Sequence, residues 1–470
     1  MVHYNLLFAV SQLMTFHATL TQLAAITNAS LHCCDLDCQS APVQGITTDS
    51  REVEPGNLFV ALRGDRFDGH EFVAQVKDKG AIAALVDHPV SVELPQIVVK
   101  DTLTAYQQLG RWWRDQFQIP VIAITGSVGK TTTKELIAAV LGTAGRVCKT
   151  EANNNNEIGV PKTLLGLAHD HDFAVIEMGM RGRGEIAQLA QIARPTIAVI
   201  TNVGTAHIGR LGSREAIAEA KCELLAELPA ASIAILNADS PLLIQTAQKV
   251  WSGTTITYGL TTGDLRGTLV DDQTLELVGI QYPLPLPGEH NALNYLAAIA
   301  IARHLNLDQA PLRTGLCVNL PSGRAQRRPL ANDVVLLDET YNAGVESMEA
   351  ALKLLAQTPG QRRIAVLGAM KELGDHAPEL HRQVGQRVQD LGLDLLLILG
   401  TGCEGTALAS GTTTVPTQQF ATHDALVDYL MTEIQPGDRL LFKASHSVGL
   451  DRVVAALEQR WSPAPAVTAS

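Results

Sequence analysis

The chain has 470 residues, of which 46% are hydrophobic, 18% charged and 4% aromatic, a balance that excludes a fibrous or wholly disordered protein. Asp and Glu number 48 against 36 Lys and Arg, and the net charge of -12 argues against nucleic acid as a main partner. The length predicts about two to four domains.

The N-terminal region shows no targeting signal and no metal motif. Residues 1–14 lack the basic stretch and cleavage site of a signal peptide, so either Met1 or Met14 is the start. Cys33, Cys34 and Cys38 cluster, but no second pair of ligands follows at zinc spacing, and we predict no zinc site there. The 7 cysteines do not indicate a disulfide framework. No apolar run reaches the roughly 20 residues of a spanning helix. We therefore expect a cytoplasmic protein without a membrane span.

The first block of the chain has short strand-like runs separated by helical stretches. The clearest runs lie at 57–62 and 81–86. We predict that residues 1–115 form an N-terminal domain.

The second block alternates apolar strands with helical patterns. Short strands that are apolar throughout, placed between helices, indicate a parallel sheet covered on both faces. A Pro-rich stretch at 282–288 interrupts the alternation before a long apolar helix at 290–304. We predict a central domain over 116–325, with strands at 121–125, 173–178, 196–202 and 232–239 and helices at 131–141, 184–193 and 214–227.

The third block restarts the alternation after residues 321–329. Its pattern indicates a second doubly wound α/β domain, over 326–462. The tail at 463–470 is rich in Ser, Pro and Ala, and we expect it to be disordered. The predicted strands of this block lie at 333–339, 363–368, 394–400 and 438–445.

A phosphate-binding loop is predicted at 125–135, where TGSVGKTTTKE follows an apolar strand and opens a helix. Its glycines would let backbone N–H groups approach phosphate oxygens. Lys130 would neutralise the β- and γ-phosphates, and Thr131 would bind Mg²⁺. The loop is shorter than the common form, and the alternative is a glycine turn before a helix with a solvated lysine. We favour nucleotide binding by Gly126, Ser127, Val128, Gly129, Lys130, Thr131 and Thr132.

Two further polar side chains follow neighbouring predicted strands. Glu177 ends one strand, and His207 lies just past the next. The carboxyl ends of parallel strands meet at one crevice, so we expect both residues to bind a divalent ion near the γ-phosphate. Taken singly, each could instead be a structural hydrogen-bonding residue.

Four consecutive asparagines occupy 153–156. Exposed amides suit a polar lining around a peptide or a sugar, and a plain solvated loop is the alternative. We assign Asn154, Asn155 and Asn156 to substrate binding.

The order of these and later motifs resembles the Mur ligases, the ATP-dependent amide-forming enzymes of peptidoglycan precursor synthesis. The resemblance covers nearly the whole chain, from about residue 47 to 457. It implies an N-terminal UDP-substrate domain, a central P-loop ATPase domain with a parallel sheet and a C-terminal Rossmann-like domain. The motifs are TGSVGKTT, NNEIGVPKTLL, EMGMRGRGEI, TNVGTAHIG, GEHNALNYLAAIA, DETYNAGVESMEAAL and LGAMKELG.

The resemblance implies roles for individual residues around ATP and two Mg²⁺ ions. Lys130 would bind phosphates, Thr131 and Glu177 would bind one Mg²⁺, and His207 would bind the second. Lys221 matches a lysine that is carbamylated in related ligases, and its alternative is a solvated helix lysine. The implied catalytic residues are Lys130, His207 and Lys221. The other implied nucleotide-binding residues are His290, Asn291, Asn294, Arg324, Asp338, Tyr341 and Asn342.

The stretch 47–73 resembles the family's UDP-sugar-binding region. Its acceptors, hydroxyls and guanidinium suit uracil and a diphosphate, and an arginine is a strong bidentate anchor for phosphate. The alternatives are a simple turn at Asp68 and Gly69 and capping by Asp49 and Ser50. The assigned residues are Asp49, Ser50, Arg51, Gly64, Asp68, Gly69 and His70.

Within the family, NNEIGVPKTLL and the Tyr-Asn-Ala at 341–343 are typical of the member that joins D-alanyl-D-alanine to UDP-N-acetylmuramoyl-tripeptide. The alternative is the member that adds the third residue to the dipeptide. The tripeptide would carry lysine or meso-diaminopimelate, and the resemblance implies a monomer. A P-loop protein that hydrolyses ATP without ligation is the rival from another class.

Three departures from the family pattern lie in the predicted C-terminal domain, where D-Ala-D-Ala is expected to bind. Ala369 stands where the family has Asp, Gly344 and Val345 stand in place of Asn-Pro, and His446 ends a motif that usually ends in Arg. Neither Cys148 nor Cys222 is expected to act as a nucleophile.

Overall fold

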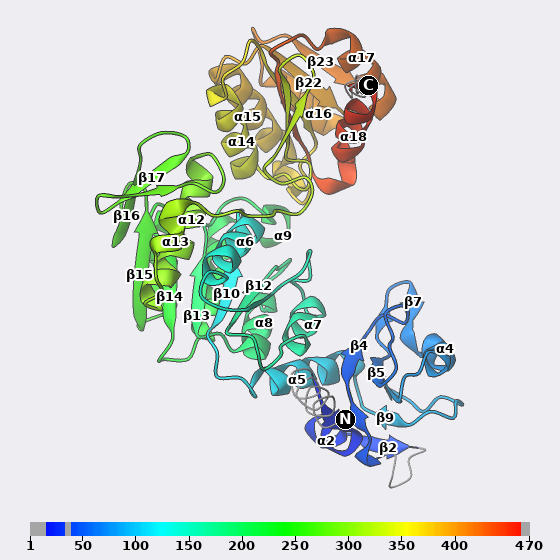
Figure 1. The fold of residues 1–470 in the computed structure, drawn as a ribbon. Coiled ribbons are helices and arrows are strands. Elements are labelled where there is room, and N and C mark those ends of the chain that lie inside the picture. The colour runs from blue at the N-terminus through cyan, green and yellow to red at the C-terminus, as the bar shows by residue number, and fades with distance from the viewer. Residues whose placement is uncertain (1–15, 33–38, 462–470) are drawn as a thin grey trace, which may run out of the picture.

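The computed structural model describes residues 16–32 and 39–461. They form three bodies in chain order, with the central body between the other two (Figure 1). The cysteine cluster at 33–38, the choice between Met1 and Met14, and the predicted disorder at 463–470 lie outside these residues. The predicted α/β class is confirmed, because each body contains a sheet with parallel strands.

The N-terminal body contains a five-stranded sheet in the order β2-β9-β8-β5-β4, in which β2 alone runs antiparallel to its neighbour. The strands predicted at 57–62 and 81–86 are present as β5 and β8. Two separate two-stranded antiparallel sheets are formed by β1 with β3 and by β6 with β7, and only β6 and β7 are joined as a hairpin. The elements are β1 Ala18–Thr19, α2 Leu20–Ile26, β2 Ser30–His32, β3 Pro42–Val43, β4 Gly45–Thr47, β5 Asn57–Val60, β6 Arg63–Gly64, β7 Phe67–Asp68, η1 Gly69–Phe72, α4 Val73–Asp78, β8 Ala83–Val86 and β9 Gln96–Val98.

Helix α5 (Thr102–Arg114) joins this body to the central one. Asp101 caps its start by accepting a hydrogen bond from the Thr104 N–H at 2.6 Å. The buried Trp113 donates from Nε1 to the carbonyl of Leu167 at 3.0 Å, and the buried guanidinium of Arg114 donates to Ala193. These contacts tie α5 firmly to the central body. The predicted domain boundary at 115/116 falls just after this helix.

The central sheet has nine strands in the order β11-β12-β10-β13-β14-β15-β16-β17-β18. The strands from β11 to β16 are parallel, and β17 and β18 are antiparallel to their neighbours. Both faces of β10 are buried: Ile122 and Ile124 pack on the side of α6 and α12, whereas Val121 and Ala123 pack on the side of α7, α8 and α10. The strands are β10 Val121–Thr125, β11 Val147–Lys149, β12 Phe173–Glu177, β13 Ile197–Ile200, β14 Ile233–Asn237, β15 Thr254–Gly259, β16 Leu265–Leu269, β17 Thr274–Leu277 and β18 Ile280–Pro283.

The alternation of strands and helices stops before the helix α12, because β15 to β18 follow one another without a helix, and β18 extends into the Pro-rich stretch as far as Pro283. Proline is tolerated there because β18 is the edge strand and needs no further ladder donor. The helices of the central body are α6 Lys130–Leu141, α7 Gly159–Leu165, α8 Glu185–Ala193, α9 Ile208–Leu211, α10 Arg214–Ala226, α11 Pro241–Val250, α12 Glu289–His304 and α13 Ala310–Thr314.

The C-terminal sheet has six strands in the order β19-β20-β24-β21-β22-β23, and all but the edge strand β19 are parallel. The four predicted strands are present, and the half-exposed edge strands β19 and β23 were not predicted. The elements are β19 Gln326–Leu330, β20 Val334–Asp338, α14 Val345–Gln357, β21 Arg363–Gly368, η2 Gly374–His376, α15 Ala377–Asp390, β22 Leu395–Leu399, α16 Cys403–Ser410, β23 Thr417–Phe420, α17 His423–Glu433, β24 Arg439–Lys443, η3 His446–Val448 and α18 Leu450–Trp461. Among the helices of the described residues, none has the length and apolar character needed to cross a bilayer.

Candidate functional site

A cavity of about 1060 Å³ lies at the carboxyl ends of β10, β12 and β13, between the central and C-terminal bodies. Ligand sites of open α/β sheets occupy this position. Of the predicted central and C-terminal site residues, only Gly126, Asn154, Lys221 and Asp338 do not line it. The residues that do are Ser127, Val128, Gly129, Lys130, Thr131, Thr132, Asn155, Asn156, Glu177, His207, His290, Asn291, Asn294, Arg324, Tyr341 and Asn342.

The phosphate loop needs glycine at two positions. Gly126 has φ 156°, and a Cβ there would come within 1.9 Å of the hydroxyl of Thr201. Gly129 has φ 82° at the start of α6, and its Cβ would lie 2.8 Å from Oδ1 of Asn294. The loop therefore adopts a backbone path that other residues would not allow.

The segment after β13 holds this loop in place through hydrogen bonds. Thr201 donates from Oγ1 to the carbonyl of Val128 at 2.7 Å, and Oδ1 of Asn202 accepts from the Val128 N–H at 3.0 Å. The Gly204 N–H donates to Oγ of Ser127 at 2.8 Å. The loop is preorganised at the N-terminus of α6, where free N–H groups and the helix dipole favour an anion.

Lys130 folds over the same loop. Its Nζ donates to the carbonyl of Gly126 at 2.8 Å. Burial lowers the pKa of Lys130 from its usual range, while the charge of Glu177 opposes that shift. A nearby triphosphate would favour the charged ammonium.

Glu177 and Thr131 offer hard oxygen donors next to the loop. Glu177 is 2% exposed; its Oε1 accepts from Nδ2 of Asn155 at 2.8 Å, whereas its Oε2 is buried with no partner among the described residues. Thr131 is likewise buried. An unpartnered carboxylate oxygen and a hydroxyl from residues that line the same cavity are a donor set that suits Mg²⁺. The residues present therefore fit the predicted ion.

The asparagine loop is more structured than a plain solvated loop. Asn155 directs its amide to Glu177, and Oδ1 of Asn156 accepts from the Gly159 N–H at 2.9 Å at the start of α7. Asn154 packs its backbone against Gly159, where a Cβ would lie 2.2 Å from the Asn154 carbonyl carbon. Two of the three predicted residues thus line the cavity and also hold the fold together.

Lys221 is buried on α10, with 1% of its surface exposed. This burial shows that the alternative of a solvated helix lysine is wrong. Burial, reinforced by the charge of Lys130, moves the pKa of Lys221 well below its ordinary value. Burial also raises the pKa of the neighbouring Cys222 thiol to about 12, and that of Cys148 to about 12. Neither thiol is a thiolate at neutral pH, which agrees with the prediction that neither is a nucleophile.

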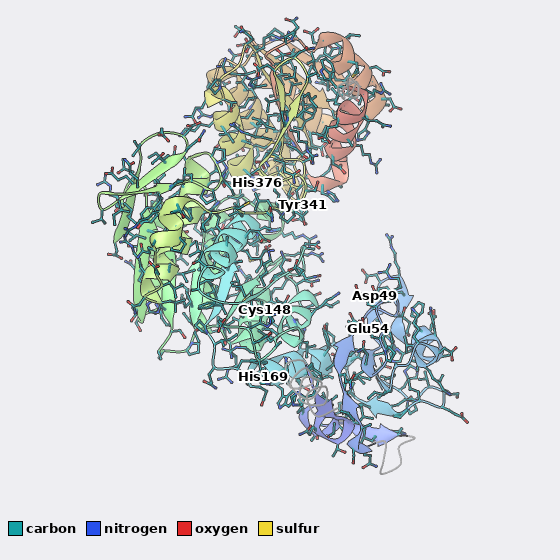
Figure 2. All side chains as sticks on the ribbon, in the orientation of Figure 1. Asp49, Glu54, Cys148, His169, Tyr341 and His376 are labelled. Carbon is teal, nitrogen blue, oxygen red and sulfur yellow. The ribbon has the colours of Figure 1, made fainter. Side chains whose placement is uncertain are left out.

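Residues from the segment between α13 and β19 and from the C-terminal body close the other side of the cavity. The guanidinium of Arg324 lies 3.8 Å from the centre of the Tyr341 ring, and His446 stacks on Tyr341 with ring centres 5.8 Å apart. Figure 2 shows Tyr341 at the junction of the two bodies. Lys443 donates from Nζ to the carbonyl of Asn342 at 2.9 Å. These cations and rings form one wall of the cavity.

Asp338 is placed differently from the expectation of nucleotide contact. It is 2% exposed, accepts from Oγ1 of Thr340 at 2.7 Å and pairs with Arg328 at 3.0 Å. Its carboxylate supports the turn that carries Tyr341 and does not line the cavity.

Sequence reasoning missed two acidic residues that connect the bodies. Oε1 of Glu346 accepts from the Thr205 N–H at 2.7 Å, and Oε2 of Glu372 lies 2.5 Å from Nδ1 of His207. Both residues lie within motifs that carry the family resemblance, and these motifs could have marked them as functional. Their partners could not be identified, because they are distant in the chain.

The predicted UDP-binding residues lie in the N-terminal body, away from the cavity. Arg51 pairs with Asp49 at 2.6 Å with 85% of its side chain exposed, and this hydrogen bond lowers the pKa of Asp49 to about 2. The carbonyl of Ser50 accepts from Nζ of Lys79 at 2.8 Å. Figure 2 shows Asp49 far from Tyr341.

The second half of this predicted site is a hairpin followed by a short 3₁₀ turn. Gly64 is exposed on the hairpin, and Gly69 packs so closely on Leu62 that a Cβ would lie 2.7 Å from the Leu62 carbonyl oxygen. Oδ1 of Asp68 lies 2.5 Å from Nδ1 of His70. The buried His70 accepts at Nε2 from the Asp87 N–H at 3.1 Å, so both ring nitrogens are engaged inside the fold.

His70, Asp87 and His88 are also close enough together for a metal ion, the one such grouping among the described residues. The bond from the Asp87 N–H occupies Nε2 of His70, and Nη2 of Arg63 lies 3.2 Å from Asp87. A cation beside this guanidinium would be repelled. The grouping is therefore a hydrogen-bonded cluster.

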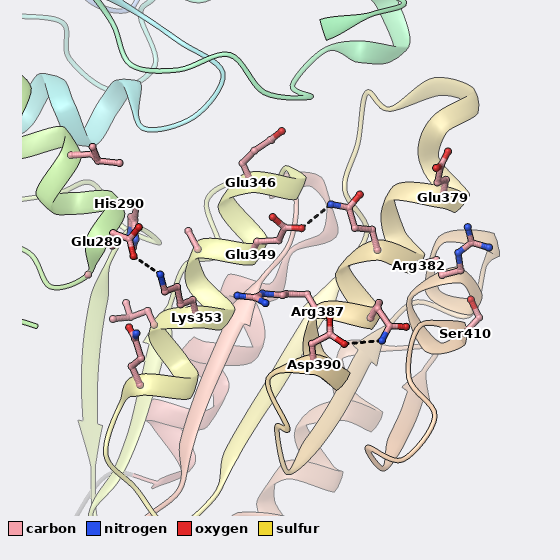
Figure 3. A pocket seen from close by; sticks show the side chains of 17 residues that line it. Glu289, His290, Glu346, Glu349, Lys353, Glu379, Arg382, Arg387, Asp390 and Ser410 are labelled. Carbon is pink, nitrogen blue, oxygen red and sulfur yellow. Dashed lines mark hydrogen bonds and ion pairs between the residues drawn. The ribbon is translucent and has the colours of Figure 1, made fainter. Parts of the chain in front are cut away.

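A smaller cavity of about 740 Å³ lies between α12, α14 and α15 (Figure 3). Three pairs of its polar side chains bond to each other: Lys353 with Glu289, Gln383 with Glu349 at 2.8 Å, and Gln386 with Asp390 at 2.9 Å. This cavity adjoins the larger one through His290 and Glu346.

Comparisons with known proteins cover the three bodies in turn. Residues 42–111 match the catalytic-domain model of the Mur ligase family, residues 124–302 match the Mur ligase middle domain, and residues 323–446 match the Mur ligase glutamate ligase domain. The chain is 58% identical to the UDP-N-acetylmuramoyl-tripeptide--D-alanyl-D-alanine ligase of Synechocystis sp., over 93% of this chain and 94% of that protein. It is 39% identical to the Escherichia coli ligase of the same name, over 94% of this chain and 98% of the relative.

Solved structures agree with this relationship. The crystal structure I of MurF from Acinetobacter baumannii matches with a TM-score of 0.87 and 33% identity, over 95% of this chain and 99% of that one. MurF ligase from Thermotoga maritima in complex with ADP matches with a TM-score of 0.80 and 29% identity, over 89% of this chain and 98% of that one.

Proposed function

The chain belongs to the Mur ligase family, and on that premise we propose that it joins D-alanyl-D-alanine to UDP-N-acetylmuramoyl-tripeptide at the expense of ATP. The similarity to ligases of that name over almost the full length of both chains supports this reaction. The observation that carries it is the cavity in which the phosphate loop meets residues of the C-terminal body. That arrangement suits a reaction with two substrates besides ATP.

The reaction requires two steps and no protein nucleophile. The terminal carboxylate of the tripeptide attacks the γ-phosphate, which gives an acyl phosphate and ADP. The amine of D-alanyl-D-alanine then attacks the activated carbonyl, and phosphate leaves. Lys130 and the loop N–H groups would stabilise the charge on the transferred phosphoryl group. Closure of the bodies over the cavity would exclude water from the acyl phosphate.

The first of two Mg²⁺ ions would be held by Thr131 and Glu177. It would offset the repulsion between a carboxylate and the triphosphate. The unpartnered Oε2 of Glu177 supports this assignment.

A second ion would be held by His207 and a carbamylated Lys221. Carbamylation consumes a neutral amine and CO₂ and releases a proton, leaving a carboxylate on Nζ. The burial of Lys221 and its lowered pKa support this chemistry, because they favour the neutral amine. The product would place an anion beside the metal, where the unmodified amine would be a cation whenever it is protonated.

The UDP part of the substrate would bind the N-terminal body through Asp49, Ser50 and Arg51.

We propose that the chain has domains at 1–115, 116–325 and 326–462, and that the protein is a monomer. The thiols of Cys148, Cys222, Cys317 and Cys403 are free, which supports the cytoplasm as the compartment of the enzyme.

A coupled phosphate-release assay tests the proposal. Release should require ATP, UDP-N-acetylmuramoyl-tripeptide and D-alanyl-D-alanine together. Release with the UDP-linked dipeptide and a free diamino acid would instead identify the ligase that adds the third residue. ATP hydrolysis that is independent of both acceptors would identify the rival P-loop ATPase.

A further inference from the structure

The pair His207 and Glu372 joins the central and C-terminal bodies beside the proposed metal site. Nδ1 of His207 lies 2.5 Å from Oε2 of Glu372, although 165 residues separate them in the chain. Nε2 of His207 forms no hydrogen bond within the described residues. We propose that Glu372 is a positioning residue that fixes the tautomer and ring orientation of His207, so that Nε2 is available to a divalent ion when the two bodies are docked. This inference rests on the ATP and metal site proposed above.

The tautomer follows from the chemistry of the contact. A carboxylate only accepts hydrogen bonds, so Nδ1 must carry the proton that it shares with Glu372. In a neutral imidazole the other nitrogen then has the free lone pair that a metal requires. A carboxylate that orients a metal-binding histidine in this way also raises its basicity.

The backbones of the two bodies touch at the same place. The Gly209 N–H donates to the carbonyl of Glu372 at 3.2 Å. A Cβ on Gly209 would lie 2.4 Å from the nitrogen of Gly374, and a Cβ on Gly374 would lie 2.8 Å from Cα of Gly209. Any side chain at either glycine would separate α9 from the 372–374 turn. The contact that carries Glu372 to His207 is therefore specific to this docked arrangement.

Both members of the pair have left-handed backbones, with φ 68° at His207 and φ 65° at Glu372. This conformation is unfavourable for residues other than glycine, and it concentrates at sites where geometry matters for function. The Glu372 side chain is 39% exposed and lies outside the hydrophobic core. Its role is therefore separable from the stability of the fold.

The test measures the Kd of Mn²⁺ by electron paramagnetic resonance at saturating ADP, in the full chain. Glu372→Ala should raise the Kd about ten-fold or more, the usual effect of removing a carboxylate behind a metal-binding histidine. Glu372→Gln should have a smaller effect, because its amide oxygen still accepts from Nδ1. Glu379→Gln, an exposed carboxylate at the start of the nearby α15, is the matched control and should leave the Kd unchanged.

A second set of variants distinguishes the positioning of His207 by Glu372 from a general effect of losing the negative charge of Glu372. In a His207→Ala background, Glu372→Ala should have no further effect on the Kd, because the two residues act through one interaction. An unchanged Mn²⁺ Kd in Glu372→Ala, or its full effect without His207, overturns the inference. Failure of the unaltered chain to bind Mn²⁺ with ADP would overturn the proposed function as well. If the unaltered chain joins D-alanyl-D-alanine to the UDP-linked tripeptide and Glu372→Ala leaves the Kd of Mn²⁺ unchanged, only the inference about Glu372 is overturned.

Discussion

Nδ2 of Asn155 donates to Oε1 of Glu177 at 2.8 Å, while the other carboxylate oxygen of Glu177 is buried without a partner in the described part of the chain. The amide thus fixes one half of the carboxylate and leaves the other half for a cation. Asn155→Ala should raise the Kd of Mn²⁺ roughly ten-fold or more, since a ligand that loses its supporting bond loses its orientation.

The same change should lower the free energy of unfolding by about 1–3 kcal/mol in the absence of metal, because it leaves a buried carboxylate with fewer hydrogen bonds. Urea denaturation measures this loss. Unchanged metal affinity together with lower stability would show that Asn155 serves the fold alone.

Lys130→Ala should reduce turnover by about 10²-fold or more, because Lys130 is the cation placed to stabilise the transferred phosphoryl group. Within the described residues, the hydrogen bonds of its Nζ go to the carbonyls of Gly126 and Ser127 in the loop, so the melting temperature should change little. Steady-state phosphate release and a thermal melt check both parts. Near-normal turnover would contradict the assignment of the phosphate loop.

The parallel strands that could be predicted are those whose residues are apolar on both faces, as in VIAIT and LLLIL. The edge strands were missed because their sequences, such as QRRPL in β19 and TQQF in β23, are polar and half-exposed. Edge strands have one unpaired side and one partner, so their sequences need not carry the apolar signal.

The phosphate loop could also be predicted from the sequence, because all of its residues lie in one local motif. The roles of Glu346 and Glu372 could not be predicted, because their contacts with Thr205 and His207 join positions 141 and 165 residues apart. Such pairs depend on how two bodies dock, which local spacing does not encode. Asp338 shows the reverse case: its motif suggested a nucleotide contact, but its carboxylate is occupied by Thr340 and Arg328.

Arg51→Ala should raise the KM for the UDP-linked substrate well above its effect on the KM for ATP. Arg51 is 85% exposed and pairs with Asp49 in the N-terminal body, outside the cavity that holds the phosphate loop. Its exposed guanidinium would also bind a diphosphate. Initial rates with each substrate varied in turn measure the two values. Equal effects on both would argue against a separate UDP site in this body.

The same variant should change the titration of Asp49. The side-chain hydrogen bond from Arg51 is the largest cause of the lowered pKa of Asp49, which falls from 3.8 to about 2. In Arg51→Ala the pKa should rise toward 3.8 without reaching it, since the Arg51 N–H still donates to the carboxylate. A lowered carboxyl pKa stabilises the fold above the unfolded value, and that contribution is lost as the pH falls toward about 2. The variant should therefore lose less stability in acid, and NMR titration of Asp49 measures the shift directly.

Lys221→Ala should be nearly inactive, and added acetate or formate should restore part of the rate by replacing the carbamate carboxylate. Lys221 is buried with its pKa well below the ordinary value, so the neutral amine that reacts with CO₂ is favoured. Occupancy of the carbamate should rise with bicarbonate and fall in acid, where the amine is protonated and CO₂ is released. Native mass spectrometry of the unaltered chain in bicarbonate should show the mass of one added CO₂, which Lys221→Ala should lack.

Lys221→Met is the control variant, because it fills the same buried space without charge and separates loss of packing from loss of the carbamate. Near-normal turnover in both variants would rule out a role for the carbamate, and rescue of Lys221→Ala by chloride as well as by acetate would show that the carboxylate is not what the site requires.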